Sequence, residues 1–416
     1  MPFLTRRLEA QPGRPFTIAA AFLVAFGFLP LPFGSVASLT MALCALIALA
    51  QVATRTTPLS FPPPVRFAVV ACLLYFAVDA LSAVIYQSHG QPLAAMGASL
   101  QFAFFPLMLA ALGQALAPHE DPIRLFVRGA RIGAILALIL AVIEALSGVD
   151  RPRGGMINPI PFGSVAALFA FVSLIGIDRD DARGRILAGV AFTSGLAASF
   201  LSQSRGGWIA LPVFVVIFLA YLRARLGTRA LLAGVAVLAA LTVIAVAVAG
   251  PTLRDRMRET IVMFEVSDLS RNDPESRSLD QRVLLWIYGW KAFKDRPVLG
   301  YGPEQRVEVT QSLARDDGYR IIPFGHLHNE FLTEAVSNGI VGLATLLLVL
   351  AAPVVTALRS ARDSLRSDRI ALAALAVAGA GLNGLTALAF GHDILNTVYV
   401  GALLAVALSA SWRQPG

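Results

Sequence analysis

Residues 331–358 read FLTEAVSNGIVGLATLLLVLAAPVVTAL, and this run carries a single charged side chain, Glu334. About 20 consecutive apolar residues are enough for a helix to cross the hydrocarbon layer of a membrane. Backbone N–H and C=O groups have no water to bind inside lipid, so a helix that pairs them internally is favoured for such a run. The stretch therefore predicts a membrane-spanning helix.

Similar apolar runs recur along the chain. Its 416 residues are 56% hydrophobic and 14% charged, with a mean hydropathy of +0.70, whereas soluble domains have about 45–50% apolar and about 25% charged residues. The pattern predicts an all-α, polytopic membrane bundle of about twelve transmembrane helices. We expect these spans at Phe16–Phe33, Val36–Val52, Val65–Tyr86, Leu93–Leu116, Ile132–Ser147, Phe162–Ile177, Ile186–Leu201, Trp208–Leu222, Ala230–Ala249, Phe331–Leu358, Ile370–Phe390 and Ile394–Ala410.

Arginine placement predicts the orientation. If the N-terminus is cytoplasmic, most arginines outside one long loop fall in cytoplasmic connections, as the positive-inside rule describes for bacterial inner-membrane proteins. Both termini are then cytoplasmic. The chain divides into residues 1–249 with nine helices, a large periplasmic loop at 250–330, and residues 331–416 with three helices. Long loops of this kind are usually functional or disordered, and the aromatic content of this one favours order.

The charge balance and the cysteines exclude several classes of function. The net charge is +8, but the topology accounts for the arginines, so we expect membrane lipids and no nucleic acid as partners. Cys44 and Cys72 lie inside apolar runs and show no metal-ligand spacing. Asp178-Arg179-Asp180 forms a nominal D-x-D, but it sits in a short cytoplasmic turn. We therefore expect no metal and no cofactor.

Two arginines near the predicted outer surface are candidates for binding an anion. Small residues flank Arg205 in Ser202–Trp208. They leave room for a large anionic ligand, and the five donors of a guanidinium suit a diphosphate. Alternatively, Arg205 extends toward water from a helix end. Arg282 and Trp286 are four residues apart, so they share one helical face as a ligand site or as a cation–π surface pair.

Histidines precede the run quoted above. His326 and His328 stand beside Asn329 and Glu330, and a histidine there could deprotonate a hydroxyl group near neutral pH. The alternatives are a metal site or a histidine that only shapes the loop. The glycines of Gly339-x-x-Gly342 would let the following helix pack closely against a neighbour.

Several segments resemble the O-antigen ligase and polymerase superfamily. His328-Asn329, nine residues and then Gly339-x-x-Gly342 are similar to its signature. Three further segments are similar to motifs of that family and occur in the same order: Gly154–Pro159, Ser204-Arg205-Gly206, and Arg282 with Trp286 and Gly300-x-Gly302.

The resemblance implies transfer of a glycan from undecaprenyl diphosphate to a hydroxyl group on lipid A-core, on another glycan or on a protein. It implies that Arg205 and Arg282 hold the diphosphate and that His328 activates the acceptor, with no metal or nucleotide. Other residues near these motifs are candidate substrate contacts: Arg153, Asn158, Trp286, His326 and Asn329. His326 gives a second candidate base, so the choice between the two histidines stays open.

The residue chemistry is compatible with an inverting, metal-independent transfer at the periplasmic face. Two guanidinium groups would neutralise the leaving diphosphate, and a neutral histidine would take the acceptor proton. A ligase, a polymerase and a protein-glycosylating enzyme all remain open. A polysaccharide transporter or flippase is a further alternative, although the chain shows no internal repeat and its polar groups gather at the outer face.

Overall fold

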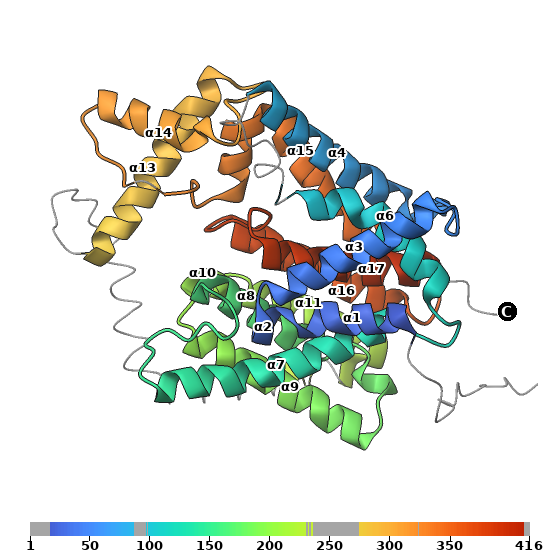
Figure 1. Ribbon diagram of the computed structural model, residues 1–416. Coiled ribbons are helices and arrows are strands. Elements are labelled where there is room, and N and C mark those ends of the chain that lie inside the picture. The colour runs from blue at the N-terminus through green and yellow to red at the C-terminus, as the bar shows by residue number, and fades with distance from the viewer. Residues whose placement is uncertain are drawn as a thin grey trace, which may run out of the picture.

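The computed structural model describes residues 17–86, 97, 99–229, 232, 234–235, 274–322 and 324–411. Every regular element in these ranges is helical (Figure 1). The elements are α1 (Ile18–Phe28), α2 (Pro30–Phe33), α3 (Val36–Ala53), α4 (Pro63–Ile85), α6 (Leu100–Ala115), α7 (Pro122–Leu146), α8 (Pro159–Val172), the 3-10 turn η2 (Ile177–Arg179), α9 (Ala182–Leu201), α10 (Arg205–Trp208), α11 (Leu211–Leu226), α13 (Pro274–Asp295), α14 (Gln305–Asp316), α15 (Glu330–Arg359), α16 (Arg366–Gly384) and α17 (Asp393–Ser411).

The predicted fold class is confirmed, but the predicted count of twelve spans is not. Among the described residues, 7 helices are long and apolar enough to cross a membrane, and three shorter apolar helices accompany them. The first predicted span divides into α1 and α2 where Pro30 starts a new helix, because proline has no N–H for the preceding helix. The ninth predicted span, Ala230–Ala249, and residues 250–273 fall outside what the structure describes.

Helix α7 begins at Pro122, well before the predicted start at Ile132. The Asp121 carboxylate caps the helix, and Pro122 suits its first turn. Arg131 lies inside the helix yet is almost fully buried, because its guanidinium contacts the Asp180 carboxylate at 2.6 Å. In a membrane sequence a charged residue usually indicates the end of a helix. A charge that has an ion-pair partner can nevertheless be buried inside a helix.

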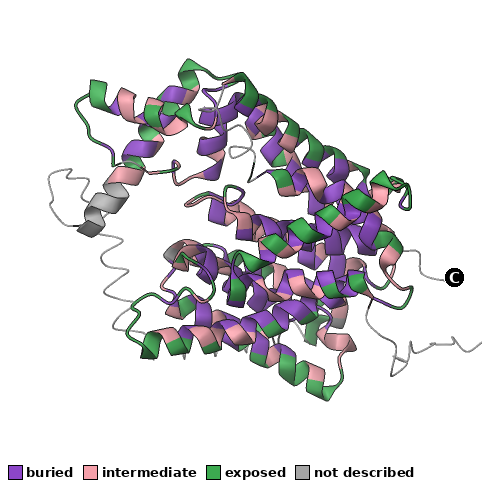
Figure 2. Ribbon diagram, in the orientation of Figure 1, coloured by how far each residue is buried: buried purple, intermediate pink, exposed green. Residues whose placement is uncertain are grey.

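Helix α17 forms the centre of the bundle. In its apolar window 83% of the residues are buried, against 50% or less in the other six candidate spans. Figure 2 shows purple along most of its length. Its first turn follows the connection 385–392, and Phe390 of that connection packs edge-on against Phe102 and Tyr399. The most enclosed helix therefore carries a firmly anchored connection at its start.

Part of the long loop folds into a small helical unit on the bundle. Helices α13 and α14 enclose their own apolar core, which includes Leu285, Tyr288, Ala314 and Leu327. In Figure 1 this unit lies beside the start of α15. The described part of the loop is therefore ordered, as its aromatic content predicts.

Helix α15 is broken at Gly339, whose φ is 64° and ψ −157°. The segment 297–302 crosses the break, and the Pro297 carbonyl accepts the Ile340 N–H at 2.8 Å. A Cβ on Gly339 would lie 2.2 Å from the Val298 carbonyl oxygen. The expected close packing of this helix against a neighbour is found at Gly339, where the neighbour is the backbone of the segment 297–302.

Candidate functional site

Four separated segments meet at one end of the bundle, which we call the histidine end. They are Ser202–Trp208, Arg282–Trp286, Gly325–Glu330 and the connection 385–392. Figure 1 places α10 and the starts of α15 and α17 on the same, left-hand side. Three of the four motif segments are thus linked by contacts, through Trp286 and the connection 385–392.

Two side chains, those of His326 and Trp286, form hydrogen bonds with the backbone of the histidine loop. The His328 N–H donates to Nδ1 of His326 at 3.0 Å, and the ring centroids of the two histidines are 4.2 Å apart. The indole N–H of Trp286 donates to the Leu327 carbonyl at 3.0 Å. Phe324 contacts the His328 ring edge-on, with centroids 4.8 Å apart. Trp286 therefore positions the histidine loop, and no cation–π contact with Arg282 is found among the described residues.

Asn329 and Glu330 connect the histidine loop to the connection 385–392. Asn329 caps α15 by accepting the Leu332 N–H at 3.0 Å, and its amide donates to the Leu385 carbonyl at 3.4 Å. The buried Glu330 carboxylate accepts the N–H groups of Ala389 and Phe390 at 2.8 and 3.3 Å. In the structure Asn329 thus has a capping role, whatever it contributes to substrate binding.

Helix α10, which begins at Arg205, lies against the same connection. Gln203 adopts a positive φ of 53° just before it, and the Ser204 hydroxyl donates to the Ile160 carbonyl at 3.1 Å. A Cβ on Gly206 would lie 2.9 Å from the Thr386 hydroxyl oxygen. Any larger residue at position 206 would require the Thr386 side chain to move. The connection 385–392 thereby brings the backbone at Arg205 near the start of α15.

Arg282 is half-buried and has no partner in the described part of the chain. Its Nε atom is buried without a hydrogen bond, and burial lowers the pKa of the guanidinium. An arginine nevertheless keeps its charge at any physiological pH. A half-buried guanidinium whose Nε lacks a hydrogen bond is suited to an anionic ligand. Among the described residues, Arg282 is the candidate phosphate contact with the clearest physical support.

Both histidines are held neutral. Burial, followed by the nearby Arg306, Arg282 and His392, lowers the pKa of His326 to about 4. Burial, followed by His326 and Arg282, lowers the pKa of His328 to about 4. Nε2 of His328 is buried and has no hydrogen-bond partner in the described part of the chain. A neutral imidazole with an unpaired nitrogen can take a proton from a hydroxyl group that reaches that nitrogen.

Arg153 and Asn158 lie near the same end of the bundle but are not joined to the histidines by any contact that the described residues show. Arg153 is exposed, and its guanidinium donates to the Ile157 carbonyl at 3.3 Å. Asn158 is exposed and caps α8 by accepting the Ile160 N–H at 2.9 Å. Their predicted substrate contacts stay predictions.

Sequence reasoning missed Arg306, which belongs to α14. Its guanidinium makes only long bonds, at 3.4 Å to the Ser337 hydroxyl and 3.5 Å to the Gly325 carbonyl. Its charge acts on His326 and on the buried Glu330. Nothing in the sequence distinguishes Arg306 from the other basic residues of the long loop, because its neighbours come from helices distant in the chain.

The nominal D-x-D belongs to an ion-pair cluster at the opposite end, where α7, α9 and α16 begin. Asp180 pairs with Arg124 and Arg131 at 2.8 and 2.6 Å, and Asp178 pairs with Arg225 at 3.0 Å. Among the described residues, no group of three or more His, Cys, Asp or Glu side chains is placed to hold a metal ion.

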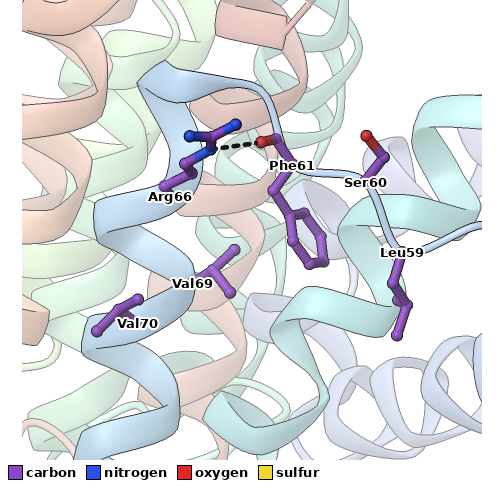
Figure 3. A pocket seen from close by; sticks show the side chains of 6 residues that line it. All are labelled: Leu59, Ser60, Phe61, Arg66, Val69 and Val70. Atoms are coloured by element: carbon purple, nitrogen blue, oxygen red, sulfur yellow. Dashed lines mark hydrogen bonds between the residues drawn. The ribbon is translucent and has the colours of Figure 1, made fainter.

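A groove of about 440 Å³ near the start of α4 is also distant from the motif residues. Its lining includes Leu59, Phe61, Arg66 and Val70, and the Arg66 Nε–H donates to the Phe61 carbonyl at 2.9 Å (Figure 3). It lacks the unpaired polar atoms of the histidine end. The candidate site is therefore the histidine end.

Comparison with known proteins supports this choice. Residues 188–347 match the family described as O-antigen ligase, and that range contains Arg205, Arg282 and the histidine loop. An uncharacterized protein of Haemophilus influenzae is 24% identical over 214 residues, which cover 50% of this chain and 53% of that protein. The matched region thus spans about half the length of the curated relative. Residues 188–347, which hold three of the four motif segments, are thus similar to the O-antigen ligase family.

Proposed function

We propose that the chain transfers a glycan from undecaprenyl diphosphate to an acceptor hydroxyl at the periplasmic face of a bacterial inner membrane. The observation that carries the proposal is the neutral, unpaired imidazole of His328 beside the unpaired guanidinium of Arg282. The first suits a general base and the second suits a diphosphate leaving group. The superfamily match supports transferase chemistry over the transporter alternative.

The proposed reaction is a single displacement. The acceptor oxygen attacks the anomeric carbon, the bond from that carbon to the diphosphate oxygen breaks, and its electron pair leaves with the diphosphate. Attack from the opposite face inverts the anomeric centre. The acceptor proton passes to His328, and Arg282 together with Arg205 neutralises the released undecaprenyl diphosphate.

The two guanidinium groups take the part that a divalent cation plays in many phosphate-leaving reactions. We therefore expect full activity in the presence of EDTA. A loss of activity with EDTA that is restored by Mg²⁺ or Mn²⁺ would contradict this assignment.

The acceptor distinguishes a ligase from a polymerase. Purified protein in detergent is given lipid-linked repeat units, either alone or with lipid A-core. Product on lipid A-core identifies a ligase, and ladders formed from the donor alone identify a polymerase. A folded protein that forms neither product, with a range of hydroxyl acceptors, would contradict the proposed transfer.

A further inference from the structure

The bond between the two histidines fixes the protonation of the first. Nδ1 of His326 accepts the backbone N–H of His328 at 3.0 Å. A ring nitrogen that accepts a hydrogen bond carries no proton, so a neutral His326 has its proton on Nε2. The two nitrogen atoms of His326 therefore have different tasks, and neither is an open proton acceptor.

His328 has a backbone conformation that L-residues rarely adopt, with a φ of 51°. Such a conformation persists only where the surroundings determine it, and it is common at functional sites. Leu327, fully buried between the two histidines, donates its N–H to the Thr333 hydroxyl at 3.3 Å. The bond to His326 is the one contact in the described structure that holds the His328 N–H itself.

We propose that His326 is a positioning residue: its Nδ1 holds the backbone of His328 in the left-handed conformation and so orients the imidazole that takes the acceptor proton. The inference rests on the proposed function, in which His328 is the base. It settles the choice between the two histidines, because it assigns proton transfer to His328 and orientation to His326.

The charges around His326 favour this task. After burial, Arg306 of α14, Arg282 of α13 and His392 before α17 lower its pKa, and no carboxylate is among the groups that shift it. The His328 ring lies next to it, with centroids 4.2 Å apart. Protonation would place a hydrogen on Nδ1 and break the bond to the His328 N–H. Burial and the surrounding cations oppose that protonation, so the bond persists at neutral pH.

Substitution by asparagine separates positioning from proton transfer. The Oδ1 atom of asparagine can occupy nearly the place of histidine Nδ1 and accept the same N–H, but an amide cannot act as a general base. Phenylalanine keeps a ring against His328 and removes the acceptor. His326→Asn thus keeps the hydrogen bond from the His328 N–H, and His326→Phe removes it.

The test measures kcat, donor KM and the pH profile of glycan transfer for both variants and for His328→Ala. We expect His326→Asn to keep wild-type kcat within about threefold and an unchanged pH profile, since the base is intact. We expect His326→Phe to lose about 10-fold or more of kcat with an unchanged donor KM, because a misplaced base affects the chemical step.

The outcomes are distinguishable. A kcat for His326→Asn as low as that of His328→Ala would overturn the inference, since His326 would then be a base. Wild-type kcat in His326→Phe would overturn it as well, and His326→Leu repeats that measurement if the phenylalanine variant does not fold. Full activity in His328→Ala would instead remove the proposed function on which the inference rests.

Discussion

Replacing Arg282 by alanine tests the proposed role of the unpaired guanidinium. The side chain has no ion-pair partner in the described part of the chain, so its removal strands no buried carboxylate and should leave the fold intact. Loss of one preorganised donor to a developing anion lowers kcat by about 10²–10³-fold, or about 2.7–4 kcal/mol. We expect that loss for Arg282→Ala and a smaller one for Arg282→Lys, which keeps the charge but not the fork.

The same substitution has a second, independent effect. Arg282 lowers the pKa of both His326 and His328 in the free protein, so Arg282→Ala should raise both values while it lowers activity. The assay measures the initial rate of undecaprenyl diphosphate release at saturating donor, with melting temperature as the test of folding. Arg315→Ala, at an exposed position on α14, is the matched control. A kcat for Arg282→Ala within threefold of wild type would show that Arg282 does not stabilise the leaving diphosphate.

Three further predictions concern pH, backbone geometry and the far end of the bundle. The folded protein holds the His328 pKa at about 4, below the ordinary 6.5. The contribution of neutral His328 to the free energy of unfolding is therefore complete above pH 6.5 and is lost as the pH falls toward 4. Bound diphosphate adds negative charge near His328 and should raise the pKa of its imidazole. The acid limb of kcat, which reports the donor complex, should therefore lie at higher pH than that of kcat/KM, which reports the free enzyme. Coincident limbs would argue against donor binding beside His328. Gly339→Ala, with a positive φ and a backbone carbonyl 2.2 Å from the new Cβ, should lower the melting temperature more than Gly342→Ala, where φ is not positive. Equal melting temperatures would show that the break in α15 is not required. Asp180→Ala leaves Arg131 buried and unpaired and should destabilise the fold by about 3–5 kcal/mol in thermal unfolding, without changing the kcat of the folded fraction; a specific loss of kcat would link the far end to catalysis.

The membrane helices with uninterrupted apolar runs were predictable from the sequence. The predicted spans Val36–Val52 and Phe331–Leu358 differ from α3 and α15 by one residue at most. The start of α7 was not predictable, because Arg131 is neutralised by Asp180, 49 positions along the chain. A hydropathy pattern contains no information about such a partner.

The candidate site was predictable in its residue types and not in its bonds. The motif around His328 indicated a base, but the bond from its N–H to His326 and its positive φ depend on the folded loop. Asn329 was expected to contact substrate, and the structure shows it capping α15. Arg306 had no sequence signal, because its neighbours come together only when α14 packs against α15.

Glycan transfer with His328 as the base requires that two products appear together. Wild-type protein and His328→Ala are each given a lipid-linked glycan and a hydroxyl acceptor, and both undecaprenyl diphosphate and the new glycoside are quantified. We expect equal amounts of the two products from the wild type, an inverted anomeric centre, and a rate reduced by about 10²–10⁴-fold in His328→Ala. Equal rates in the two proteins, or diphosphate release without a glycoside, would contradict this expectation.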